Sequence, residues 1–265
     1  LLELQVHQTV LEVNLDAIFH NLNEFRRHLN KGTRIMAMVK AFAYGAGPAE
    51  IAGLLEYHRV DYLAVAYADE GVELRKAGVT LPVMVMNPEE SAYETMIMYD
   101  LEPEIFSIQS FQQFSDIAAR HGLIQYPVHI KVDTGMHRLG FMPGEIAELS
   151  AKIKVTESIK IISVFSHLAA SDDPSLDNFT QGQVSLFKTM ADKLEEAAGY
   201  PFLRHILNSS GIALFPQYQF DMVRPGIGIY GVGDLAGFDL RITGRFTTRI
   251  SQVKPIPPFE PVGYG

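Results

Sequence analysis

The sequence predicts a (β/α)8 barrel, and three observations support this prediction. Short apolar strands alternate with amphipathic helices from residue 15 to about residue 230, which is the pattern of a parallel sheet. The strands are mostly unbroken in hydrophobicity, as expected of strands that are buried on both faces. The chain has 265 residues, enough for one such barrel with little left over. We therefore expect a closed barrel over 15–231 rather than an open sheet.

The elements follow from periodicity. TVLEVNL (9–15) alternates like a strand, and the apolar residues of 15–29 recur on one helical face behind Asn14, a residue type that caps helices. Eight strands are expected after it, at 34–39, 62–66, 83–86, 104–106, 127–133, 158–165, 202–207 and 221–224. Helical periodicity is found at 48–58, 69–77, 89–99, 110–121, 144–154 and 178–198, with a short helix near 210–215.

The pattern changes after Gly231. The next residues resemble a loop, GRFTTRISQVK (244–254) alternates like a half-exposed strand, and IPPFEP is a proline-rich turn or linker. We expect 1–14 to be a strand of a second, β-rich domain, and 232–265 to be a linker and the truncated start of that C-terminal β-domain. Since the chain lacks an initiator Met and stops at PVGYG, we expect it to be a piece of a longer protein.

Composition narrows the classes of function. Lys plus Arg number 22 against 31 Asp plus Glu, a formal net charge of −9, which disfavours nucleic acid and anionic membranes as partners. Cysteine is absent, so disulfides, thiolate nucleophiles and cysteine-ligated metals are excluded; this fits a reducing compartment. No apolar run approaches the roughly 20 residues that span a bilayer, and the N-terminus lacks the features of a signal peptide.

Five polar or glycine-rich clusters come directly after predicted strands. They are KAFAYGAG (40–47), DTGMHR (133–138), Ser166-His167, NSSG (208–211) and RPGIG (224–228). In such barrels the active site lies on the loops after the carboxyl ends of the strands. We therefore expect these five clusters to converge on one site.

Individual residues allow more than one interpretation. A desolvated Lys40 would be a nucleophile toward carbonyls, but a solvated lysine at a strand end is equally compatible with the composition. Residues 226–231 match G-x-G-x-x-G, yet no helical pattern follows and no acidic residue stands about 20 positions on, so wrapping of a single phosphate is the better interpretation. His129 and His137 lack metal-ligand spacing and a nearby carboxylate cluster, so we expect them to be hydrogen-bonded structural residues.

Together the clusters resemble a known family. The resemblance rests on segments that follow one another along nearly the whole chain, namely TVLEVNLDAIFHNL, MVKAFAYGAG, HIKVDTGMHRLGF, FSHLAASDD, HILNSSG, MVRPGIGIYG and PVGYG. In this order they resemble the N-terminal barrel domain of alanine racemase, a pyridoxal 5′-phosphate (PLP) enzyme of fold type III. The lysine loop, DTGMxRxGF and VRxGIxxYG are specific only in combination. Phe42 and Ala46 depart from the family pattern, which has a polar residue and a histidine there, and we expect this to affect local packing.

The resemblance implies a cofactor site. Lys40 matches the Schiff-base lysine, which in the family is also the base on the D-alanine face. Tyr44, Ser209, Gly226 and Ile227 resemble the phosphate contacts, the last two through their backbone.

The resemblance also implies roles around the cofactor ring and the substrate. Arg138 matches the arginine near the phenolic oxygen and the substrate carboxylate, and Lys131 a lysine that is often carbamylated and braces that arginine. His167 matches the histidine beside the pyridine ring and Arg224 the arginine that faces the ring nitrogen. Tyr264 matches the second catalytic base, donated across a dimer interface to the partner's cofactor, and we expect a chain Tyr264–His167–Arg224 to lower its pKa.

The function that the resemblance implies is an isomerase reaction, the two-base interconversion of L- and D-alanine, which supplies D-alanine for peptidoglycan in a bacterial cytoplasm. We expect a homodimer with shared active sites. The racemase part of a fusion behind a cell-wall ligase is one interpretation of the missing initiator Met. The alternatives are a non-catalytic PLP-binding homeostasis protein on the same barrel and a fold type III decarboxylase. The expected strand after residue 244 argues against the first, and Arg224, in place of an acidic residue at the pyridine nitrogen, argues against the second.

Overall fold

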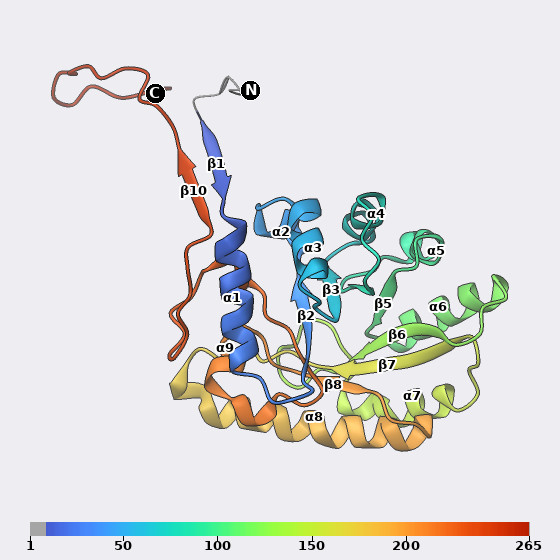
Figure 1. The fold of residues 1–265 in the computed structure, drawn as a ribbon. Coiled ribbons are helices and arrows are strands. Elements are labelled where there is room, and N and C mark those ends of the chain that lie inside the picture. Colours follow the sequence, from blue (N-terminus) through green and yellow to red (C-terminus); the bar gives the residue numbers. More distant parts are fainter. Residues whose placement is uncertain (1–8, 265) are drawn as a thin grey trace.

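Eight parallel strands form the centre of the computed structural model, which describes residues 9–264 (Figure 1). They are β2 (Arg34–Met38), β3 (Tyr62–Val65), β4 (Val83–Val85), β5 (Glu102–Ile105), β6 (Tyr126–Lys131), β7 (Ile159–Phe165), β8 (Leu203–His205) and β9 (Met222–Val223). The strand order is β8-β7-β6-β5-β4-β3-β2-β9. Two backbone hydrogen bonds join the outer strands, from Asp221 N to Arg204 O (3.1 Å) and from Arg224 N to Leu207 O (2.9 Å). The expected barrel is confirmed, nearly closed.

Helices alternate with these strands as the periodicity predicts. They are α1 (Leu15–Arg27), α3 (Pro48–Tyr57), α4 (Ala68–Lys76), α5 (Tyr93–Met98), α6 (Ile108–Arg120), α7 (Ile146–Ile153), α8 (Asp177–Ala198) and α9 (Ser209–Leu214). Short 3₁₀ turns are η1 (Glu90–Ala92), η2 (Pro143–Glu145), η3 (Pro174–Leu176), η4 (Pro216–Tyr218) and η5 (Ile227–Tyr230). Asn14 caps α1, because its side chain accepts a hydrogen bond from Ala17 N at 3.0 Å. Most boundaries agree with the expected ones to within one or two residues, the largest differences being at strand ends.

The inner face of the barrel is apolar on one side and polar on the other. A small buried cluster fills the apolar side, consisting of Met36, Met38, Tyr62, Ala64, Met84, Phe165 and Met222. On β5 to β8 most inward positions other than Phe165 are instead polar, and they are Glu102, Glu104, His129, Lys131, Ser163 and His205, all buried. The larger core lies between the strands and the surrounding helices. Since side chains alternate along a strand, a strand that is apolar outside can carry charge inside.

Outside the barrel, a two-stranded antiparallel sheet joins the two ends of the described chain. It pairs β1 (Val10–Val13) with β10 (Gly244–Thr247), with Val10 opposite Thr247 (Figure 1). The strand expected over 244–254 is therefore shorter than predicted. Residues 248–264 are exposed and contain no strand, since β10 finds a partner only along the four residues of β1.

The segment after β2 differs from the expected polar turn. Within α2 (Lys40–Tyr44), Ala41, Phe42, Ala43 and Tyr44 all have positive φ, between 51° and 57°, so the chain makes a left-handed turn. For residues with a Cβ this conformation costs roughly 1–2 kcal/mol each. Backbone hydrogen bonds hold the turn, including Ala43 N to Val39 O (3.0 Å) and Gly45 N to Ala41 O (3.1 Å). No glycine occupies 41–44, so composition gives no sign of it.

Among the described residues, no helix combines the length and the apolar character that crossing a bilayer requires.

The left-handed turn predicts the effect of a glycine. Ala41 is exposed and has φ of 53°, so Ala41→Gly relieves the Cβ strain and should raise the free energy of unfolding by about 1 kcal/mol. Ala151 is exposed in the right-handed helix α7, and Ala151→Gly should lower it by about 1 kcal/mol. Urea denaturation of the two variants checks this, and destabilisation by both would contradict the left-handed assignment.

Candidate active site

A cavity of about 310 Å³ lies at the carboxyl ends of the barrel strands. Its lining residues are Met38, Lys40, Tyr44, Met86, Lys131, Arg138, His167, Asn208, Ser209, Ser210, Arg224, Gly226 and Ile227. Every site residue expected from the sequence is among them except Tyr264. The five strand-end clusters thus contribute to a single cavity.

Positive charge dominates this cavity, through Lys40, Lys131, Arg138 and Arg224. Burial lowers the pKa of Lys40, and the positive charge of Arg138 lowers it further, while Glu70 opposes the shift. The Lys40 amine is therefore neutral at a lower pH than that of an ordinary lysine. A cavity of this charge favours an anionic ligand.

One wall of the cavity is a backbone cradle. Ser209 Oγ accepts hydrogen bonds from Gly226 N (3.0 Å) and Gly228 N (3.3 Å), which leaves its own proton available for a ligand. A Cβ on Gly226 would lie 2.8 Å from Tyr44 Oη, and one on Gly228 would lie 2.5 Å from Phe25 Cζ. Only glycine lets the backbone approach so closely. The segment forms the single 3₁₀ turn η5, although no helical pattern was expected there.

Tyr44 completes this wall. Its ring packs against Tyr230 with centroids 4.8 Å apart, and Tyr230 donates to Met38 O at 3.0 Å. Burial raises the pKa of Tyr44, so its hydroxyl stays protonated and can donate a hydrogen bond. Hydroxyl donors and glycine backbone in a positively charged cavity are the groups that hold a phosphate.

Arg224 is buried inside the barrel and bonded on several sides. Its guanidinium lies 2.7 Å from His205 Nδ1 and 3.3 Å from His167 Nδ1, and it donates to Ser166 O at 2.7 Å. Among the described residues, its Nε makes no hydrogen bond and remains a donor for a ligand. Burial lowers its pKa to about 10, so the group stays charged at neutral pH.

The bonds continue from Arg224 across the barrel interior. His205 Nε2 lies 2.8 Å from Ser163 Oγ, Ser163 Oγ lies 2.7 Å from His129 Nδ1, and His129 Nε2 lies 2.7 Å from Glu102 Oε2. Because arginine can only donate, His205 accepts at Nδ1 and donates from Nε2 to Ser163, so His205 carries a single ring proton. Burial, with the charge of Arg224, lowers the pKa of His205 well below its usual value, consistent with this.

His129 and His137 each contact one carboxylate. His129 Nε2 lies 2.7 Å from Glu102 Oε2, and His137 Nδ1 lies 3.1 Å from Asp133 Oδ2. Both histidines are hydrogen-bonded, as expected. Within the part of the chain that the structure describes, no three His, Asp or Glu side chains gather as a metal site.

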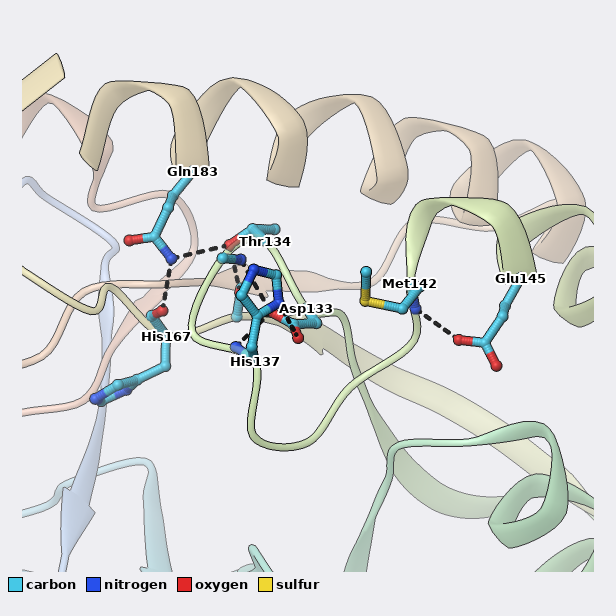
Figure 2. Close-up of polar contacts among 9 residues, drawn as sticks. Asp133, Thr134, His137, Met142, Glu145, His167 and Gln183 are labelled. Carbon is cyan, nitrogen blue, oxygen red and sulfur yellow. Dashed lines mark hydrogen bonds and ion pairs between the residues drawn. The ribbon is translucent and has the colours of Figure 1, made fainter. Parts of the chain in front are cut away.

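Asp133 and Gln183 fix the loop that carries Arg138 (Figure 2). Asp133 Oδ1 accepts from Gly135 N (2.9 Å) and His137 N (3.1 Å), which folds 133–138 back on itself. Gln183, on α8, donates to His167 O at 3.2 Å and to Thr134 Oγ1 at 3.4 Å, so it links this loop to the one with His167. Burial and Arg224 together lower the pKa of His167 to about 3, so its imidazole is neutral.

Tyr264 is not part of this cavity. Its side chain is fully exposed near the end of the described chain, and within one chain it makes no hydrogen bond to His167. Of the expected chain Tyr264–His167–Arg224, only the second contact is present here.

Sequence reasoning missed three buried residues around the cavity, namely Glu104, Gln183 and His205. FLRHIL (202–207) and EPEIF (102–106) carry charged and polar residues at expected strand positions, and that was the available signal. Gln183 lies on an amphipathic helix and carries no such signal.

Comparison with known proteins agrees with this arrangement. The family model described as alanine racemase, N-terminal domain, matches residues 13–234. The alanine racemase of Synechocystis sp. is 34% identical over 265 residues, covering 96% of this chain and 70% of that protein. The alanine racemase of Thermodesulfovibrio yellowstonii is 36% identical over 257 residues, covering 96% of this chain and 68% of that protein.

Solved structures give the same result. An alanine racemase of Clostridium difficile 630 superposes with a TM-score of 0.90 at 34% identity, covering 99% of this chain and 70% of that chain. The alanine racemase from D-cycloserine-producing Streptomyces lavendulae superposes with a TM-score of 0.91 at 26% identity, again over 99% and 70%. Lys40, the backbone cradle at Ser209 and Gly226, and the buried Arg224 thus lie around one cavity, on a fold and sequence shared with these enzymes. The chain belongs to the alanine racemase family.

Proposed function

We propose that this chain interconverts L- and D-alanine with PLP held in the cavity at Lys40. The observation that carries the proposal is the convergence of Lys40, the Ser209–Gly226 cradle and Arg224 on one cavity. When bound, PLP supplies the electron sink without which the α-proton of an amino acid is too weakly acidic to remove. The chain's own residues would bind the cofactor and the substrate, orient them, and move the α-proton.

Lys40 would hold the cofactor covalently and act as the acid and base on the D-alanine face. Its lowered pKa makes the neutral amine available, which both tasks require. The phosphate would lie against Ser209 and Tyr44, with the backbone of Gly226 and Ile227 beside it. The hydroxyls of Ser209 and Tyr44 both have a proton to donate there.

Arg224 would face the ring nitrogen and donate a hydrogen bond to it. Since a guanidinium keeps its proton at neutral pH, the ring nitrogen would stay unprotonated, which limits the lifetime of negative charge at Cα and favours its reprotonation there. The bonds to Ser166 and His205 fix the orientation of the guanidinium. His167, neutral and bonded to Arg224, would lie beside the ring.

Arg138 would bind the carboxylate of alanine, as a fixed guanidinium does best. The loop bonds of Asp133 and Gln183 hold the segment that carries it. Water-excluding side chains in the lining, among them Met38 and Met86, leave a small space suited to a small amino acid.

The second base would be Tyr264 of a partner chain. Racemisation needs an acid and base on each face of Cα, and the described cavity supplies only Lys40 on one face. An exposed Tyr264, distant from its own cavity, is available to another copy. We therefore propose a homodimer with shared sites, a bacterial cytoplasmic setting, and D-alanine for peptidoglycan as the product's use.

Trapping of the cofactor tests the proposal directly. After incubation with PLP and reduction with borohydride, peptide mass mapping should find the phosphopyridoxyl group on Lys40, because this lysine lines the same cavity as Ser209 and Gly226 and its amine is neutral at a lower pH than that of an ordinary lysine. Lys40→Ala should abolish the label, whereas Lys152→Ala, at a partly exposed lysine on α7 that does not line the cavity, should leave it unchanged. Label scattered over surface lysines in the unsubstituted chain would refute the site.

The pKa of Lys40 predicts a pH dependence. Arg138 lowers that pKa through its charge, so Arg138→Gln should raise it, and the neutral amine should then appear only at higher pH. The midpoint of the rate of PLP attachment against pH, followed by absorbance, should move upward. Arg120→Gln, on the exposed end of α6, is the control and should not move it. An unchanged or lower midpoint for Arg138→Gln contradicts the assignment.

Tyr264→Phe should abolish proton exchange on one face of the substrate Cα and leave it on the other. Exchange of the α-proton of L-alanine with solvent should stop, while D-alanine still exchanges at Lys40; equal loss for both would exclude Tyr264 as the second base. Mixed dimers of Lys40→Ala and Tyr264→Phe chains, purified through two different tags, keep one intact shared site of two and should show about half the wild-type turnover. No recovery in mixed dimers would show that Tyr264 does not act on a partner's site.

A further inference from the structure

Glu104 is a fully buried carboxylate beneath the cavity that the proposed reaction does not use. It lies on β5, and neither of its side-chain oxygens has a hydrogen-bond partner among the described residues. Its one close contact is an ion pair, with Lys131 Nζ 3.1 Å from Oε1. A buried charge in this position needs a specific counter-charge.

The register of β5 and β6 brings the side chains of Glu104 and Lys131 together. Glu104 lies opposite His129 in the parallel pair of β5 and β6, so Lys131 is its diagonal neighbour two residues further on the same face. Lys131 is also buried, 5% exposed, and lines the cavity. Because both side chains come from adjacent strands of the barrel, their contact does not depend on a flexible loop.

Glu104 is a buried anion close to several cations. Among these cations Lys131 acts on it most strongly, and the charges of Arg224 and Arg138 act on it in the same sense. Lys40 and the neutral His167 also line the cavity. Among the described residues that line the cavity, none is acidic.

We propose that Glu104 is a built-in counter-ion that keeps Lys131 unmodified, so that Lys131 does not carry the carbamate that the matching lysine of the family often carries. Carbamylation requires a neutral amine, whose lone pair forms a bond to the carbon of CO2 while a proton leaves the nitrogen. Lys131 Nζ instead lies 3.1 Å from Glu104 Oε1 in a buried ion pair, which this modification would break. The product would place a second anion against a buried carboxylate, and this repulsion disfavours it further.

Glu104 also has a positioning role, because its negative charge lies among the cations of the site. A carbamate would supply one negative charge among the cations of the cavity floor, and Glu104 already supplies that charge. The site is therefore complete without CO2. The chemical state of Lys131 can be measured without bound PLP and without enzymatic activity.

Carbon-13 NMR of the chain equilibrated with ¹³C-bicarbonate tests the proposal. Burial raises the pKa of Glu104 to about 7, so the measurement belongs above that pH, where the carboxylate is ionised. The wild-type chain and Glu104→Asp, which keeps the charge, should show no lysine carbamate resonance. Glu104→Gln removes the charge with little change in shape, and should gain a resonance of up to one carbamate per chain. Adding Lys131→Met to Glu104→Gln should abolish it.

Two outcomes would overturn the proposal. A carbamate resonance in the wild-type chain that Lys131→Met removes would show that Glu104 does not prevent modification. No resonance in either wild type or folded Glu104→Gln would show that Glu104 is not the reason. Should Glu104→Gln fail to fold, as judged by circular dichroism, the wild-type spectrum still decides the first point.

A second measurement rests on the proposed function. Racemase turnover of the wild-type chain should be the same in CO2-free and bicarbonate buffers, whereas that of Glu104→Gln should rise with bicarbonate. If no chain turns over alanine, the proposed function fails while the NMR result stands. If wild-type turnover itself depends on bicarbonate, the role of Glu104 fails.

Discussion

A guanidinium can be buried inside a barrel only when its donors find acceptors, and this requirement organises the polar side of the interior. Arg224 is 2% exposed, and its partners include a ring nitrogen of His205 and the carbonyl of Ser166. From His205 the bonds run through Ser163 and His129 to a carboxylate. Each of these groups would be costly to bury alone. Together they hold a positive charge at the cavity floor in one orientation.

The wall of the cavity formed by Gly226 and Gly228 depends on backbone geometry. Gly226 and Gly228 bring the chain so close to Tyr44 and Phe25 that a Cβ at either position would collide. Between β2 and this wall, the chain passes through four left-handed residues from Ala41 to Tyr44. Strained conformations of this kind persist where surrounding structure over-determines them, and they concentrate at functional sites. Here the strained turn separates Lys40 from Tyr44, the two groups proposed to hold opposite ends of one cofactor.

Prediction from sequence worked where chemistry and periodicity coincide. Lys40 directly follows an apolar strand, and Ser209 and Gly226 follow two others, so the topology of a barrel alone brings them to one end. Prediction from sequence failed for residues whose role depends on the neighbours that the fold gives them. His205 and Glu104 appear in the sequence as polar residues within strands, and nothing in the order of residues shows which partner each one meets. Those partners lie on neighbouring strands and depend on register.

The sequence by itself determined the barrel, nearly all of its elements and most of the residues that line the cavity, because hydrophobic periodicity and strand-end clusters are local properties. Tertiary structure decided the rest. The ion pair of Glu104 with Lys131 and the polar chain from Arg224 to Glu102 depend on the register of adjacent strands. The left-handed turn after Lys40 has local hydrogen bonds, and it also depends on contacts of Ala41 with Glu70 and of Tyr44 with Tyr230. These contacts join groups that are distant in sequence, and no local pattern encodes them.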